Sequence, residues 1–442
     1  MLEKNLSRLQ FTVESGGRLT GALRVPGDKS ISHRAIMLGA LANGCTKITG
    51  FLQGEDSLAT LEAFRRMGVN IRGPQDGNVE IEGVGLHGLK ASAARLDLGN
   101  AGTAMRLMSG LLAGQAFSST LTGDASLSTR PMRRVIDPLS SMGAHIETAD
   151  DGTAPLHIHG GKSLSGIRYD MKVASAQVKS SLLLAGLYAK GETCVTEPAP
   201  TRDHTERMLT GFGYSVRRDG ATVCVSGGGQ LTATNIDVPG DISSAAFFMV
   251  AASIAKDSEV TLQHVGINPT RMGVITILNL MGANISITNR REIGGEPVAD
   301  ITIKHAALKG IAIPPQQVPL AIDEFPVIFI AAACAQGTTT LTGARELRVK
   351  ESDRIQAMAD GLDVLGIKTT VTHDGIIIEG GQMDGGKVDS QGDHRIAMAF
   401  AMAGLRAERP IIIDNCANVA TSFPNFVSLA RHSGLRINEV EV

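Results

Sequence analysis

The sequence predicts a mixed α/β fold of two domains, each built from three copies of a βαβαββ unit. Three observations lead to this prediction: the length and composition of the chain, a small and polar motif that recurs ahead of alanine-rich segments, and a glycine that recurs after each motif. With 442 residues, the chain exceeds the roughly 250–300 residues at which a single hydrophobic core stops growing. Apolar residues make up 43% of the chain and aromatic residues only 3%, so the predicted cores are aliphatic.

The recurring motif opens six segments that each read as an apolar helix. Roughly 40 residues after each motif, a glycine marks the end of a second helix. The motifs are GDKSISHR (27–34), GNAGTAMR (99–106), ASAQVK (174–179), GDISS (240–244), IDEFP (322–326) and GDHR (392–395). The glycines are Gly68, Gly143, Gly213, Gly282, Gly366 and Gly434. This regular spacing predicts six repeats.

Strands and hairpins complete each predicted unit. Between the two helices, β-branched residues alternate, as in residues 44–49 and 337–342, which is typical of a strand. After the second helix, turn residues such as Gly77 and Gly220 separate two short apolar runs and indicate a hairpin. Six units of about 70 residues are too many for one core, so we expect two domains divided near residues 238–240.

Charge and composition exclude several classes of protein. The 42 basic and 44 acidic residues leave a net charge of −2, which is no polybasic surface for nucleic acid. No apolar run approaches the ~18–20 residues of a membrane span, and the N-terminus lacks the apolar block of a signal peptide. We therefore expect a cytoplasmic protein. The five cysteines are odd in number and scattered, so we expect neither a disulfide framework nor a structural zinc site.

The helix openings predict an anion-binding site. The free N–H groups and positive dipole of a helix N-terminus attract anions, and the openings also carry Lys29, Arg34, Arg106 and Arg395. Because cations at this end of a helix oppose its dipole, they call for a compensating anion. The alternative is that the Ser and Asp residues only cap their helices, and we expect that simpler role for Ser243 and Ser244.

Four other motifs are less informative. The GVGLHG run at 83–88 ends a predicted hairpin, so we interpret it as a turn, and the GKS at 161–163 lacks the earlier glycine of a phosphate-binding loop. His157 and His159 alternate on a predicted strand, but no third ligand is evident, which disfavours a metal site. The charges in RVKESDR (348–354) are compatible with an ordinary exposed helix start.

Taken together, these motifs resemble the 5-enolpyruvylshikimate-3-phosphate (EPSP) synthase family. Six separated motifs occur in the family's order: GDKSISHR, LGNAGTAMR (98–106), STRPM (128–132), SAQ (175–177), RVKESDR and GDHR. The SAQVK run and TRDHT (201–205) are more similar to the second subgroup of the family than to the enterobacterial one. The resemblance implies a two-domain inside-out α/β barrel with six βαβαββ repeats. One domain would hold residues 27–239, and the other residues 240–442 together with a crossing N-terminal segment, 1–26.

The resemblance also implies a reaction. The family's enzyme, 3-phosphoshikimate 1-carboxyvinyltransferase, transfers the enolpyruvyl group of phosphoenolpyruvate to the 5-hydroxyl of shikimate 3-phosphate and releases phosphate, within chorismate and aromatic amino acid biosynthesis. It passes through a tetrahedral ketal and is the target of glyphosate. We accordingly expect a monomer that closes around two small-molecule substrates and uses no metal or organic cofactor, no nucleic acid and no membrane.

Site residues follow from the motifs, position by position. The resemblance implies that Asp323 accepts a proton, that Glu351 transfers one at the methylene carbon, and that Lys29 is the third catalytic residue. The implied shikimate 3-phosphate contacts are Lys29, Ser30, Arg34, Ser175, Ala176, Gln177, Asp323 and Lys350. The implied phosphoenolpyruvate contacts are Lys29, Gly102, Arg130, Gln177, Arg354 and Arg395. Two substrates with a carboxylate and a phosphate each favour such guanidinium pairs.

Two positions depart from the enterobacterial subgroup. That subgroup carries a lysine just before Thr-Phe-Pro, where this chain has TSFP (421–424), and a proline where this chain has Leu107. We hypothesise that Lys179 or Arg202 supplies the missing cation. Because Gly102 is unsubstituted, the pocket should be roomy and sensitivity to glyphosate is expected.

Two rival functions remain at this stage. The sister enzyme that transfers enolpyruvate to UDP-N-acetylglucosamine would carry a reactive cysteine ahead of its Arg-Pro, but this chain has SLSTRP there (126–131). A non-catalytic anion-binding protein would be expected to lack Glu351 or Asp323, and both are present.

Overall fold

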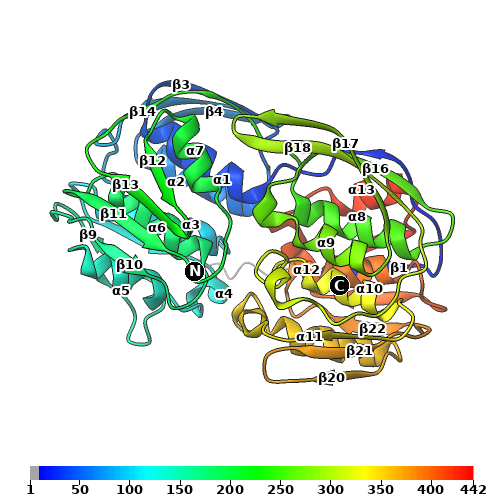
Figure 1. Ribbon diagram of the computed structural model, residues 1–442. Helices are drawn as coiled ribbons and strands as arrows, with labels where there is room; N and C mark the ends of the chain where they lie inside the picture. The colour runs from blue at the N-terminus through cyan, green and yellow to red at the C-terminus, as the bar shows by residue number, and fades with distance from the viewer. Residues whose placement is uncertain (1–8, 442) are drawn as a thin grey trace. The chain divides into compact units, whose positions relative to one another are not determined.

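The computed structural model describes residues 9–441, shown in Figure 1. The chain divides into two compact units. Unit 2 comprises Gly27–Val238 and the short segment Glu292–Glu296, and unit 1 comprises the rest of the described chain. Each unit has a hydrophobic core of its own. Both units contain helices and strands, so the mixed α/β class predicted from the sequence is correct.

Unit 2 repeats the order helix, strand, helix, hairpin, strand three times. Its elements are α1 (Lys29–Leu41), β3 (Ala42–Thr49), α2 (Glu55–Arg66), β4 (Asn70–Gln75), β5 (Asn78–Val84), β6 (Leu96–Asp97), α3 (Gly102–Ala113), β7 (Ser119–Thr122), α4 (Ala125–Ser128), α5 (Arg133–Ser141), β8 (His145–Glu147), β9 (Leu156–His159), β10 (Arg168–Asp170), α6 (Ala176–Gly186), β11 (Glu192–Thr196), α7 (His204–Gly211), β12 (Val216–Asp219), β13 (Thr222–Ser226), β14 (Leu231–Thr232) and β15 (Asn235–Asp237).

The sheets of unit 2 join neighbouring repeats. Their strand orders are β14-β3-β5-β4, with β15 also on β3, then β6-β7-β9-β8 and β10-β11-β13-β12. In each sheet, the last strand of one repeat runs parallel to the first strand of the next. The hairpin of that next repeat then pairs antiparallel with its first strand, as β9 does with β7. Because β14 and β15 of the third repeat pair with β3 of the first, the three repeats close into a ring.

Unit 1 is built from similar pieces. Its elements are β1 (Leu9–Val13), β2 (Thr20–Leu23), α8 (Ile242–Ile254), β16 (Glu259–Gly266), η1 (Pro269–Arg271), α9 (Gly273–Leu280), β17 (Asn284–Ile293), β18 (Glu296–Lys304), η2 (Pro315–Gln317), α10 (Phe325–Ala333), β19 (Thr338–Leu341), η3 (Arg345–Val349), α11 (Arg354–Val364), β20 (Thr369–Val371), β21 (Ile376–Glu379), β22 (Gly386–Asp389), α12 (His394–Ala403), β23 (Ile411–Asp414), η4 (Ala417–Thr421), α13 (Phe426–Ser433) and β24 (Ile437–Glu441). The sheet orders are β22-β23-β1-β24, β17-β18-β16-β2 and β19-β21-β20.

The N-terminal strands belong to unit 1, although most of that unit comes from the second half of the chain. β1 lies between β23 and β24 and is antiparallel to both, while β2 runs parallel to β16. Residues around the β17–β18 turn belong instead to unit 2, where Glu296 Oε1 lies 2.7 Å from His204 Nδ1 and Arg207 donates to the Gly295 carbonyl at 2.8 Å. The sequence predicted that the N-terminal segment crosses into unit 1, but it did not predict that Glu292–Glu296 belongs to unit 2.

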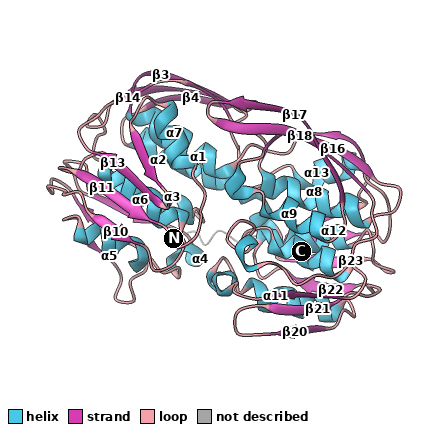
Figure 2. Cartoon of the chain, in the orientation of Figure 1, coloured by secondary structure: helices cyan, strands magenta, loops and turns pink. Residues whose placement is uncertain are grey.

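The first helix of each repeat lies inside its unit. Every residue of α8, α10 and α12 is buried, and α3 leaves only Thr103 partly accessible. In Figure 2, β20, β21 and β22 lie along one outer edge of unit 1, with α8 and α12 further inside. Helices without a polar face require apolar neighbours on all sides, and the surrounding sheets supply them. Among residues 9–441, no helix combines the length and apolar character that crossing a membrane requires.

One sequence expectation about the cysteines is wrong. Cys194 and Cys224 form a disulfide between β11 and β13, where they stand directly opposite each other in the antiparallel register. They are 30 residues apart in the chain, so only the strand pairing brings them together. Of the other cysteines, Cys416 is buried, Cys334 is partly buried and Cys45 is exposed.

Replacing Gly110 with alanine should destabilise unit 2. α3 packs against α6 so closely that a Cβ on Gly110 would lie 2.0 Å from the Ser181 carbonyl oxygen. The helices would have to move apart, at a cost of about 1–3 kcal/mol, and thermal or urea unfolding should show a lower midpoint. Gly211→Ala is the matched control, because a Cβ there meets only the Gly294 carbonyl at 3.8 Å. Equal midpoints for both variants would contradict the close helix packing.

Candidate functional site

The predicted site residues gather at the N-terminal ends of the interior helices. Those of unit 2 lie at the starts of α1, α3 and α6, and Arg130 follows α4. Those of unit 1 lie immediately before α10, around the start of α11 and in the first turn of α12.

In unit 2, Asp28 and Lys29 have different tasks at the start of α1. The Asp28 carboxylate caps the helix by accepting from the Ile31 amide at 2.9 Å. Lys29 forms an ion pair with Asp56 at 2.8 Å, and its side chain remains 18% exposed. The carboxylate of Asp56 thus provides the compensating charge that a cation at a helix N-terminus requires, while Lys29 keeps access to solvent. Sequence reasoning missed Asp56, which lies on α2.

Arg34 is buried one turn further into α1. It donates to Thr205 Oγ1 at 2.7 Å, to Ser180 Oγ at 2.8 Å and to the Ser30 carbonyl at 2.9 Å. Burial lowers the pKa of Arg34 to about 10, against the raising effect of nearby carboxylates. The same burial, with two neighbouring cations, lowers the pKa of His33 to about 3, so its imidazole is neutral at neutral pH. Arg34 therefore fixes the backbone that carries Ser30.

Gln177 connects the start of α6 to α3. Its side-chain carbonyl accepts from Arg106 at 2.8 Å, and its amide donates to Thr103 Oγ1 at 3.0 Å. Ser175 caps α6 by accepting from the Val178 amide at 3.4 Å. Gln177 of the third repeat is thus hydrogen-bonded to two residues of the second repeat. Arg106 was recognised in the sequence as a cation at a helix opening, but not as the partner of Gln177.

Arg130 and Arg106 approach the same glycine. A Cβ on Gly102 would lie 3.1 Å from Nη1 of Arg130 and 3.3 Å from Nη1 of Arg106. Arg130 is oriented by Asn100, whose side-chain oxygen accepts at 2.5 Å, and by Ser126 Oγ at 3.1 Å. The missing side chain at Gly102 leaves room between two guanidinium groups, which suits a small planar anion.

In unit 1, one buried arginine organises the predicted residues. Arg354 is 1% exposed, and its guanidinium contacts three carboxylates: Glu351 at 2.6 Å, Asp393 at 2.8 Å and Asp323 at 3.4 Å. Burial acts to lower the pKa of Arg354, but the three carboxylates outweigh burial and raise it above its usual value. Arg354 therefore stays charged and fixes the positions of both predicted catalytic carboxylates.

Asp323 is also held by the two remaining predicted cations of this unit. Lys350 Nζ lies 3.4 Å from Asp323 Oδ1, and Arg395 donates to the Asp323 backbone carbonyl at 3.0 Å. All five predicted site residues of unit 1 are thus connected. Asp393 adds a second link between α11 and α12, because it is fully buried, caps α12 through the Arg395 amide at 2.9 Å and binds Arg354. The sequence predicted an anion-binding opening at GDHR rather than a simple helix cap, and it did not predict this cap or the contact of Asp393 with Arg354.

Two sequence hypotheses need correction. Lys179 cannot provide the missing cation, because its side chain is fully buried and forms ion pairs with Glu197 and, at 2.6 Å, with Glu206. Arg202 remains as the hypothesis. Ser243 was expected to cap its helix, but Asp241 caps α8 instead. The Ser243 hydroxyl donates to Glu324 and accepts from Arg271 at 2.7 Å.

One other interpretation from the sequence is supported. The GVGLHG run begins in the end of β5 and continues into a turn. Two clusters of side chains that could ligate a metal occur in the described part of the chain, and one of them contains His159.

Removing the Asp393 carboxylate should destabilise unit 1 strongly. Asp393→Ala leaves the Arg354 charge with one fewer partner in a buried setting, and breaking such a pair costs about 3–5 kcal/mol. Asp393→Asn retains a cap acceptor and should cost less. Asp384, which pairs with Arg409 on the surface, provides the control, and Asp384→Ala should leave the midpoint of thermal unfolding unchanged. If Asp393→Ala unfolds at the wild-type temperature, the buried cluster does not carry the stability assigned to it.

Comparison with known proteins places the chain in a family. The family model described as EPSP synthase (3-phosphoshikimate 1-carboxyvinyltransferase) matches residues 13–429. A 3-phosphoshikimate 1-carboxyvinyltransferase of Methylococcus capsulatus is 69% identical over 427 residues, which cover 97% of this chain and 98% of the relative. Another from Alkalilimnicola ehrlichii is 66% identical over 431 residues, with 97% and 96% covered.

Solved structures agree with this placement. An EPSP synthase from Acinetobacter baumannii is 59% identical and superimposes with a TM-score of 0.89, covering 98% of this chain and 100% of its own. The enolpyruvyl transferase NikO from Streptomyces tendae is only 16% identical, with a TM-score of 0.79 over 99% of this chain and 100% of its own, and shows the same fold. The chain therefore belongs to the EPSP synthase family.

Proposed function

We propose that the residues gathered at the helix openings carry out the 3-phosphoshikimate 1-carboxyvinyltransferase reaction. That reaction joins the enolpyruvyl group of phosphoenolpyruvate to the 5-hydroxyl of shikimate 3-phosphate and releases inorganic phosphate. The family membership supports the reaction as a whole. The observation that supports the site assignment is the cluster around Arg354, which orients two carboxylates, Asp323 and Glu351, on one guanidinium.

The chemistry assigns these carboxylates different steps. Asp323 accepts the proton of the 5-hydroxyl as its oxygen attacks the enolpyruvyl carbon, and Glu351 donates a proton to the neighbouring methylene carbon. The tetrahedral ketal then loses phosphate as its C–O bond breaks, and the departing phosphate takes the proton held by Asp323. A methyl proton returns to Glu351 as the double bond re-forms. One acid and one base placed by fixed hydrogen bonds are typical of such proton transfers. Lys29 stabilises the charge that develops on the phosphate.

The remaining residues are assigned to the two substrates. Phosphoenolpyruvate contacts are proposed for Lys29, Gly102, Arg130, Gln177, Arg354 and Arg395. Shikimate 3-phosphate contacts are proposed for Lys29, Ser30, Arg34, Ser175, Ala176, Gln177, Asp323 and Lys350. For Arg34, the three hydrogen bonds to protein atoms favour positioning of Ser30 over direct contact. Arg202 is proposed as the cation that replaces the lysine of the other subgroup.

The architecture proposed for this enzyme is the six-repeat, inside-out α/β barrel arrangement. The domains are residues 27–239 and residues 240–442 with 1–26. The recurring element order and the buried first helix of each repeat support this arrangement. Glu292–Glu296 is an exception to the simple boundary, because these residues belong to unit 2. We also propose that the enzyme is monomeric and cytoplasmic.

Phosphate release tests the acceptor. Purified protein supplied with phosphoenolpyruvate should release phosphate when shikimate 3-phosphate is present, and not when UDP-N-acetylglucosamine replaces it. Release that requires UDP-N-acetylglucosamine would assign the chain to the sister reaction. Absence of release with either acceptor would overturn the proposed function.

Removing either carboxylate should affect the chemical step. Glu351→Gln and Asp323→Asn keep the shape of each side chain but remove its proton-transfer role, so kcat should fall by about 10²–10⁴. Glu379→Gln, on β21 and paired with Lys368, is the matched control and should retain full activity. Unfolding midpoints should accompany each measurement. A folded Glu351→Gln variant with wild-type kcat would rule out the role proposed for Glu351.

A further inference from the structure

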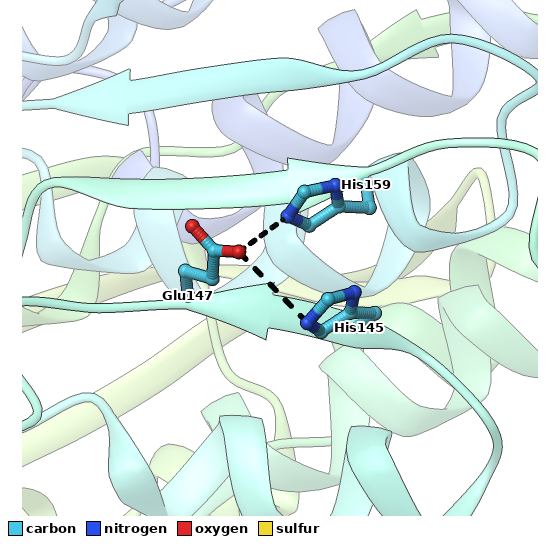
Figure 3. Close-up of side chains that lie close together, drawn as sticks. All are labelled: His145, Glu147 and His159. Carbon is cyan, nitrogen blue, oxygen red and sulfur yellow. Dashed lines mark hydrogen bonds and ion pairs between the residues drawn. The ribbon is translucent and has the colours of Figure 1, made fainter.

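Two neighbouring strands of unit 2 present imidazole and carboxylate groups on one face. In the hairpin of β8 and β9, His145 pairs with His159, Ile146 with Ile158, and Glu147 with His157. Ile146 and Ile158 are buried. Because side chains alternate along a strand, His145, Glu147 and His159 all project from the opposite face. Figure 3 shows the three side chains converging from the two strands.

The three groups are close enough to share an ion. Glu147 Oε1 lies 2.9 Å from His159 Nε2 and 3.9 Å from His145 Nε2. One ligand atom from each residue lies within 4.8 Å of the others. Ligands around a tetrahedral zinc ion at about 2.1 Å stand about 3.4 Å apart. The three side chains are 56%, 61% and 30% exposed, so small rotations in solvent can close the remaining difference.

We propose that His145, Glu147 and His159 form a surface binding site for one divalent transition-metal ion. The expected ion is Zn²⁺, with water completing its coordination. Two imidazoles and one carboxylate favour Zn²⁺, Ni²⁺ or Cu²⁺ over Mg²⁺ and Ca²⁺, which prefer oxygen ligands alone. Sequence reasoning disfavoured a metal at His157 and His159 because no third ligand was evident. The missing ligands are on the neighbouring strand, and they combine with His159.

His157 supports this site without joining it. Its Nδ1 lies 2.9 Å from Thr120 Oγ1 on β7, which fixes the ring. The ring then packs edge-on against His159, with centroids 4.6 Å apart, while His145 stacks on His159 at 4.2 Å. These contacts hold the His159 ring between its two neighbours.

Zinc titration of the full chain tests the proposal. The chain should carry no added polyhistidine tag, and reductant should be omitted so that Cys194 and Cys224 remain joined. Calorimetry or equilibrium dialysis with ZnCl₂ at pH 7.5 should show one ion per chain. His145→Ala and His159→Ala should each lower the affinity about tenfold or more, and Glu147→Gln should also weaken binding. MgCl₂ should not compete.

His432→Ala is the control, because His432 is an exposed histidine near the end of α13, and it should bind as the wild type does. Cu²⁺ electron paramagnetic resonance gives a second readout, in which nitrogen coupling should be lost when both histidines are replaced. Absence of zinc binding, or equal affinity in the wild type and both histidine variants, would overturn the proposal and leave a surface hydrogen bond only. Phosphate release should be normal in His145→Ala, so this outcome is independent of the proposed reaction.

Discussion

The burial of the first helix of each repeat beyond its first turn is the constraint on which the rest of the structure depends. Such helices have no polar side, and only their first turns offer backbone N–H groups and charged residues to other molecules. The apolar lengths of α8, α10 and α12 require sheets around them. Once the sheets are in place, polar chemistry is confined to the helix starts, which is where the predicted site residues lie in both units.

Charge at these helix starts is balanced within the protein before any substrate binds. Lys29 has Asp56, and Arg354 has three carboxylates. These partners avoid the cost of leaving buried charges unpaired in the free enzyme. A substrate anion that enters must therefore compete for cations that already have partners. The same pairing gives each cation a fixed geometry. Arginine suits this task because one guanidinium can bind several carboxylates at once.

The sequence was sufficient to predict the mixed α/β class and to place candidate residues at helix openings, because both rest on local patterns. It was not sufficient for contacts that depend on strand register or on the packing of helices. The opposition of Cys194 and Cys224, the pairing of His145 with His159 and the link from Asp393 to Arg354 all join distant segments. The hypothesis for Lys179 failed for a related reason. Lys179 belongs to the SAQVK run, but its ion pairs with Glu197 and Glu206 hold its side chain in the core.

The position of β1 has a consequence for the order in which the protein is made. Unit 2 is almost entirely one continuous stretch, Gly27–Val238, so it can begin to fold as it leaves the ribosome. β1 is synthesised earlier, but its two neighbours, β23 and β24, end at Asp414 and Glu441. β1 must therefore wait, unpaired, until both of these later strands have been made. Unit 1 completes that sheet only once β24 has been synthesised, when unit 2 already has its core.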